Sequence, residues 1–111
     1  MGEPTTDVIQ GTLDLLILKT LSLEPMHAFG IARRVEQTCR GVFKVNPGSL
    51  LTALQRLERA GWVDAEWTLT DNSRRARIYT LTRGGRRELE RQAQDWNRRA
   101  EAIARLLKAE A

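Results

Sequence analysis

One segment near the middle of the chain restricts the fold more than any other. Asn46 is a favourable N-cap and Pro47 follows at the first helical position, so a helix is predicted from there to about Ala60. Residues 62–69 then alternate apolar and polar side chains, and an Asp-Asn-Ser turn sequence separates them from a second strand over residues 76–81. The sequence therefore predicts an amphipathic helix followed directly by a β-hairpin.

Two further helices are predicted before this segment. Asp7 is a suitable N-cap with Gln10 as its capping-box partner, and the helix that follows is expected to run to about Leu23. Leu and Ile lie on most of its sides, which predicts a central core helix. A second helix is expected over about residues 27–39, and Gly41 would end it.

The last predicted helix, from about residue 83 to 109, has Thr82 as its expected N-cap and carries a heptad pattern. Its apolar residues are spaced alternately four and three apart, as in a coiled-coil seam: Leu89, Ala93, Trp96, Ala100, Ile103 and Leu107. A single helix would leave this seam in water, so a homodimer is expected. We expect Leu89, Trp96, Ile103 and Leu107 to form the dimer contacts.

The order of elements predicts a mainly α fold with a small β-hairpin, namely a winged helix-turn-helix plus a long C-terminal dimerisation helix. Residues 1–82 would form the DNA-binding part and residues 83–111 the dimerisation helix, in one compact unit. In such a fold the third helix enters the major groove and the hairpin is the wing.

Charge and surface pattern favour double-stranded DNA as the partner. The net charge is −1 over residues 1–43, +5 over residues 44–87 and zero over residues 88–111. A local basic excess is typical of phosphate binding. On the third helix, Ser49, Thr52 and Gln55 are expected to contact bases. Phosphate contacts are expected from arginines on this helix and the wing: Arg56, Arg59, Arg74, Arg75 and Arg77.

Other classes of protein are disfavoured. His27 and Cys39 are the only residues of their kinds, which is too few for a zinc site or a catalytic triad, and structural roles are expected for both. Gly84-Gly85 stands alone and makes no phosphate-binding loop. We therefore expect no enzyme activity, no cofactor and no metal. No apolar stretch approaches the roughly 20 residues that span a bilayer, and no signal peptide is recognised, so a cytoplasmic protein without membrane contact is expected.

Several short motifs recur along the predicted helices and wing. They lie in residues 11–18, 26–31, 45–50, 53–58, 61–62, 74–77 and 79–82. Together these motifs resemble the PadR-type regulators over roughly residues 8–90. The resemblance implies a dimeric, repressor-like winged helix of the short subfamily with a single C-terminal helix. The chain departs from the family pattern at Ala28-Phe29, where Gly-Tyr is common, at Leu51-Thr52, where Tyr-Pro is common, and at Ile78. Leu51 lacks the hydroxyl that Tyr could offer to a phosphate.

Trp96 is unusually large for a seam position, whereas Ala93 and Ala100 on either side are small. Two copies could hold a flat aromatic effector between them, and the resemblance also implies effector binding at the dimer interface. Trp96 could equally fill the interface alone. Trp62 and Trp67 bracket the first wing strand and are expected to serve in core and strand packing. The function expected is a sequence-specific DNA-binding regulator, a repressor released by a small molecule. The alternative is a winged helix that binds proteins instead, which predicts a neutral or apolar third helix.

Overall fold

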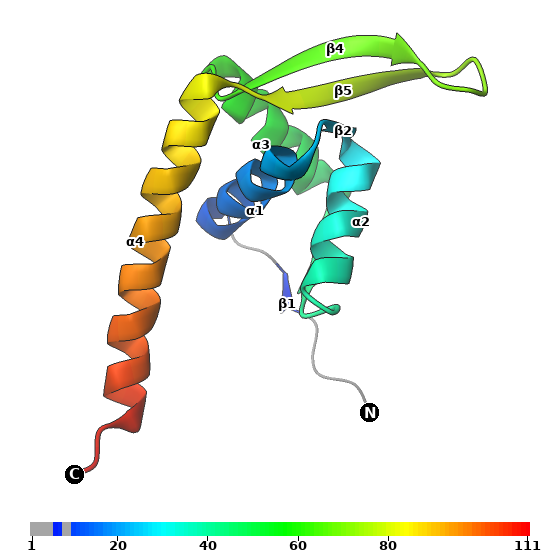
Figure 1. Cartoon of the computed structure of the whole chain (residues 1–111). Helices are drawn as coiled ribbons and strands as arrows, with labels where there is room; N and C mark the ends of the chain where they lie inside the picture. The colour runs from blue at the N-terminus through cyan, green and yellow to red at the C-terminus, as the bar shows by residue number, and fades with distance from the viewer. Residues whose placement is uncertain (1–5, 8–9) are drawn as a thin grey trace.

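The computed structural model describes residues 6–7 and 10–111. Its element order is that of a winged helix with one additional long helix (Figure 1). The elements are β1 (Thr6–Asp7), α1 (Gln10–Leu23), β2 (Met26–His27), α2 (Ala28–Thr38), β3 (Phe43–Lys44), α3 (Pro47–Arg59), β4 (Val63–Leu69), β5 (Arg75–Leu81) and α4 (Arg83–Lys108).

The sheet confirms the predicted hairpin and adds a strand. β4 and β5 pair antiparallel, with Trp67 opposite Arg77, and β2 joins the other edge of β5, with Met26 opposite Tyr79. The fold class, mainly α with a small β-hairpin, is therefore confirmed. The sequence did not indicate β2, because two residues are too few to show a period-two pattern.

The predicted cap of α1 cannot be compared directly with the structure. Asp7 lies in β1, which pairs parallel with β3, and α1 is described from Gln10. The residues that would join Asp7 to this helix are those between the two described segments. Residues 8 and 9 lie outside the part of the chain that the structure describes.

The core surrounds α1, which packs against α2, α3, α4 and β5. Ile17 and Leu18 are completely buried, as expected for a helix that is apolar on most of its sides. Thr20 is also buried, and its hydroxyl donates to the Leu16 carbonyl oxygen at 2.7 Å, so burial leaves no donor unsatisfied there. The other core residues are Leu13, Leu21, Ile31, Val35, Val45, Leu50, Ala53, Leu54, Leu57, Val63, Tyr79 and Leu81.

α4 begins tightly packed against the base of the wing. The Thr82 hydroxyl accepts from the Gly85 amide at 3.0 Å and donates to the Gly61 carbonyl oxygen at 2.7 Å, which confirms the predicted cap. Gly85 lies so close to Trp62 that a Cβ there would overlap its carbonyl oxygen. Leu89, one turn on, packs against the protomer's own core.

α4 continues beside α1 as far as Arg99, and its distal part then extends away from the rest of the molecule (Figure 1). Trp96 is 49% exposed, Ile103 59% and Leu107 81%. The expected seam is thus divided between two uses. Leu89 was expected in the dimer interface, but α4 lies over α1 at this level, so the side chain serves the protomer's own core. Within the described residues, none of the helices is long and apolar enough for a transmembrane span.

Candidate nucleic-acid interface

α3 presents one apolar face to the core and one polar face to solvent. The Asn46 side chain accepts from the Ser49 amide at 3.1 Å, and Pro47 occupies the first turn, as predicted. Leu50, Leu54 and Leu57 lie in the core. The residues expected to meet bases, Ser49, Thr52 and Gln55, are all exposed, as is Arg59.

Arg56 has a different role from the one expected. Its guanidinium donates two hydrogen bonds to Asp14 on α1, at 2.6 and 3.1 Å. The Asp14 side chain is 13% exposed and that of Arg56 is 38% exposed. A bidentate pair with a largely buried carboxylate fixes the guanidinium between α1 and α3. Arg56 therefore joins two helices and is withdrawn from the expected set of phosphate contacts.

The wing extends beyond the helices, and its tip carries two exposed arginines, Arg74 and Arg75. The turn closes through the Thr70 amide, which donates to the Arg74 carbonyl oxygen at 2.8 Å, and Ser73 adopts a left-handed φ of 60°. The turn predicted from Asp-Asn-Ser is therefore present. It leaves both guanidinium groups in solvent, where a phosphate could reach them.

Arg77 is held inside the protomer. Its Nη2 donates to both carboxylate oxygens of Glu58 on α3, at 2.9 and 3.1 Å. Its Nε is buried and has no hydrogen-bond partner within the described residues. Arg77 was expected to contact phosphate, but this pairing makes it a link between the wing and α3.

The two tryptophans of the wing have different environments. Trp62 packs against the core as expected. Trp67 was expected to serve in core and strand packing, but it is 57% exposed and lies outside the core. It lies opposite Arg77, one residue beyond the part of β5 that pairs with β2. The Arg75 guanidinium carbon lies 4.7 Å from the centre of its ring, and that of Arg77 lies 5.6 Å away. The sequence did carry a signal of this arrangement, since Trp67 and Arg77 face one another in the predicted hairpin.

The start of α2 also lies beside the wing. The His27 Nδ1 accepts from the Gly30 amide at 2.9 Å, so His27 is the N-cap of α2, one of the structural roles expected for it. Phe29 is 68% exposed, and the Arg33 guanidinium lies 5.8 Å from its ring centre. The sequence pattern predicted that Arg33 points away from the core, as found, but no surface position was predicted for Phe29. The period of α2 places Phe29 away from the buried Ile31 and Val35, and this was the available signal.

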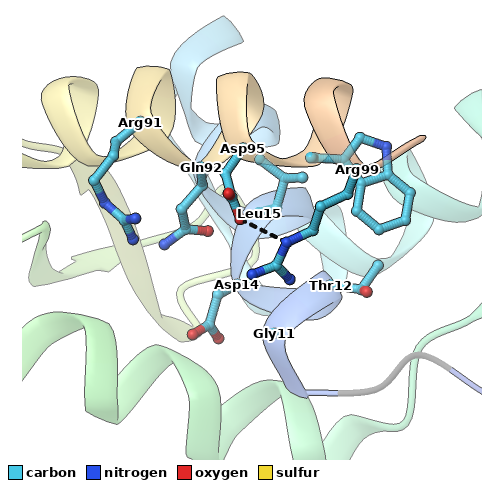
Figure 2. A pocket seen from close by; sticks show the side chains of 9 residues that line it. Gly11, Thr12, Asp14, Leu15, Arg91, Gln92, Asp95 and Arg99 are labelled. Carbon is cyan, nitrogen blue, oxygen red and sulfur yellow. Dashed lines mark ion pairs between the residues drawn. The ribbon is translucent and has the colours of Figure 1, made fainter. Parts of the chain in front are cut away.

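A pocket of about 340 Å³ lies between α1 and α4, on a different side of the molecule from the wing (Figure 2). Trp96 lines it, whereas Ala93 and Ala100 do not. Its α4 wall is charged: Arg99 pairs with Asp95 at 3.1 Å. A hydrogen bond from Arg98, with a smaller contribution from the charge of Arg99, lowers the pKa of Asp95. The other lining residues are Gly11, Thr12, Asp14, Leu15, Arg91 and Gln92.

Comparisons with known structures agree with this architecture. A PadR family transcription regulator from Clostridium difficile is 25% identical, with a TM-score of 0.75 over 86% of this chain and 97% of that one. A PadR-like transcriptional regulator from Bacillus cereus is 21% identical, with a TM-score of 0.77 over 91% and 96%. A transcriptional regulator from Clostridium thermocellum is 19% identical, with a TM-score of 0.81 over 89% and 93%.

A sequence relative and a family model also match this chain. An uncharacterised protein of Lysinibacillus sphaericus is 22% identical over 91 residues, which are 82% of this chain and 84% of that protein. The family model described as "Transcriptional regulator PadR-like family" matches residues 17–91, which include α2, α3 and both strands of the wing. Because this match covers well over half of the chain, the protein belongs to the PadR-like family of transcriptional regulators.

Proposed function

We propose that this protein is a homodimeric, sequence-specific repressor that binds double-stranded DNA and is released by a small-molecule effector. The observation that carries the DNA-binding part is the exposed polar face of α3, which lies beside an arginine-bearing wing. Ser49, Thr52 and Gln55 on α3 would contact bases. Arg59 and the wing arginines Arg74 and Arg75 would contact phosphates. The compartment proposed is the cytoplasm, where a regulator of transcription would reach the chromosomal DNA.

The DNA contacts can be tested by fluorescence anisotropy with a duplex from the gene's own upstream region. We expect affinity to fall steeply as salt rises, because bound phosphates release counterions. Arg75→Ala should weaken binding to all duplexes alike. Gln55→Ala should instead relax preference at one base position, at a cost of about 1–3 kcal/mol.

Arg105→Ala supplies a matched control, because Arg105 is 79% exposed in its side chain but lies on α4 far from the wing. This substitution removes the same charge and should leave affinity almost unchanged. Absence of binding to any duplex at about 50 mM salt would contradict DNA binding and favour a winged helix that binds proteins. Apart from Leu51, which is 49% exposed, the exposed long side chains of α3 are polar or charged, and this argues against that alternative.

Dimerisation is proposed to use the distal part of α4. Trp96, Ile103 and Leu107 recur at heptad spacing on one side of the helix and are all exposed in the protomer. Pairing of two such helices would remove these side chains from water, and each fully buried Leu or Ile contributes about 1.5–3 kcal/mol. A two-fold dimer would also place two α3 helices for successive major grooves.

Ile103→Asp tests this interface by light scattering. Because Ile103 is exposed in the protomer, the variant should be a folded monomer rather than an unfolded chain. Ala102→Asp adds the same charge on a neighbouring exposed face and should remain dimeric. If the wild type is monomeric at about 50 µM, dimerisation through α4 is refuted. A dimer with a dissociation constant of a few micromolar would be mostly assembled at that concentration.

Effector binding is proposed at Trp96, with Ala93 and Ala100 leaving space between the two copies. The charged pocket beside Trp96 supports a ligand that combines a flat aromatic ring with polar groups. Planar aromatic dyes should quench tryptophan fluorescence in the wild type and much less in Trp96→Leu. Equal quenching in both proteins would leave Trp96 with a packing role only.

A further inference from the structure

Side chains on the exposed face of the wing contact one another in series, and the series starts from Glu58 on α3. Trp67 lies directly opposite Arg77 in the β4–β5 register, and Arg75 lies opposite Leu69, two residues along the same face. Arg77 is tied to Glu58 on α3 by its bidentate ion pair. The Trp67 ring therefore lies close to two arginines: the guanidinium carbon of the ion-paired Arg77 is 5.6 Å from its centre, and that of the exposed Arg75 is 4.7 Å away.

This arrangement places an exposed guanidinium on a rigid support. A free arginine side chain loses about 1.5–2 kcal/mol of conformational entropy when it is immobilised. Stacking on an aromatic ring restricts the side chain before any ligand binds, so less of this entropy is lost on binding. The guanidinium of Arg75 makes no hydrogen bond or ion pair within the described residues, so its donors are available.

We propose that Trp67 is a positioning residue for DNA binding: its indole ring holds Arg75 for contact with a backbone phosphate, and the Arg77–Glu58 pair fixes the ring relative to α3. The proposal rests on the proposed DNA-binding function but not on any operator sequence, because phosphate contacts do not depend on sequence. In this proposal Trp67, which is exposed and lies outside the core, acts through its neighbour Arg75.

The experiment uses the full-length protein and a fluorescein-labelled duplex of arbitrary sequence, about 30 base pairs long, at several salt concentrations. Trp67→Ala should weaken binding about 5- to 30-fold for a dimer with two wings, from the usual strength of exposed cation–π contacts. The slope of log affinity against log salt should stay unchanged, because Arg75 keeps its charge. Arg75→Ala should lower that slope by about 1.8, or 0.9 for each wing.

Two further variants separate positioning from a structural role. Trp67→Phe retains an aromatic face and should recover most of the affinity, whereas Trp67→Leu should not. Leu69→Ala is the matched control, since Leu69 is 69% exposed on the same strand face but offers no ring to a cation. Its affinity should stay within about 2-fold of wild type, as for other exposed positions.

A double variant then tests whether Trp67 acts through Arg75. If it does, Trp67→Ala should cause no further loss in an Arg75→Ala background, and melting curves of all variants should agree within a few degrees. Wild-type affinity in Trp67→Ala would overturn the proposal and leave DNA binding intact. Equal losses in both backgrounds would also overturn it, because Trp67 would then act independently of Arg75. Failure of the wild type to bind any duplex would refute DNA binding itself, and this proposal with it.

Discussion

Replacement of Arg56 by alanine tests whether this arginine serves the fold or the DNA. The substitution leaves Asp14 without its two hydrogen bonds of 2.6 and 3.1 Å, in a site where the carboxylate side chain is only 13% exposed. Removal of one partner from a fully buried pair costs about 3–5 kcal/mol. Because the Arg56 side chain is 38% exposed, water can partly replace the guanidinium, and we expect about 2 kcal/mol.

This loss is large enough to measure by thermal unfolding. For a domain of this size, 2 kcal/mol corresponds to a decrease of about 10 °C in the midpoint. Protein concentration must be held fixed, because the midpoint of a dimer depends on it. In DNA titrations of the folded protein, the salt slope should not change, because Arg56 contacts Asp14 rather than a phosphate.

Arg59→Ala is the reciprocal control on the same helix. Arg59 is exposed and has no ion-pair partner within the described residues, so its loss should change stability by at most about 0.5 kcal/mol. Its proposed phosphate contact should appear as a decrease in the salt slope. A stable Arg56→Ala with a reduced slope would refute the reasoning, because that is the behaviour of a phosphate contact.

A double variant checks the cause of the lost stability. Once Arg56 is gone, Asp14→Ala removes the carboxylate that was left unpaired, so it should cost little or even restore stability. In the wild-type background the same substitution should destabilise the protein. Additive losses would show that the two residues do not act as a pair.

The other predictions concern glycine packing and helix capping. Gly85→Ala should severely destabilise the protein, because a Cβ would overlap the Trp62 carbonyl oxygen. Gly84→Ala should be tolerated, since the nearest neighbours of a Cβ there lie at 3.8 Å. Melting followed by circular dichroism would show the difference, and equal melting temperatures would contradict it. His27→Ala should cost about 1 kcal/mol through loss of the acceptor for the Gly30 amide, and His27→Asn should restore most of it; equal unfolding midpoints in urea for the two variants would argue against a capping role.

Local features of the sequence were sufficient for most of the elements. The Asn46 and Thr82 caps and the turn before Arg74 depend on residues that are close in the chain, so they could be predicted without tertiary information. β2 could not be found in this way, because its two residues are a strand only through pairing with Tyr79 and Ile78 of β5. β1 could not be found either, since Thr6 and Asp7 form a strand only through pairing with β3 from another part of the chain.

What the sequence by itself determined is the series of helices, the hairpin and the positive charge around α3 and the wing. These properties follow from capping, period and composition, which act over a few residues. The tertiary structure alone decided which arginines are free of ion pairs within the described residues and so remain available to contact phosphate. Arg56 meets a carboxylate 42 positions away and Arg77 meets one 19 positions away, whereas Arg59, Arg74 and Arg75 stay in solvent. Such pairs depend on how α1, α3 and the wing pack together, and no local pattern records that packing.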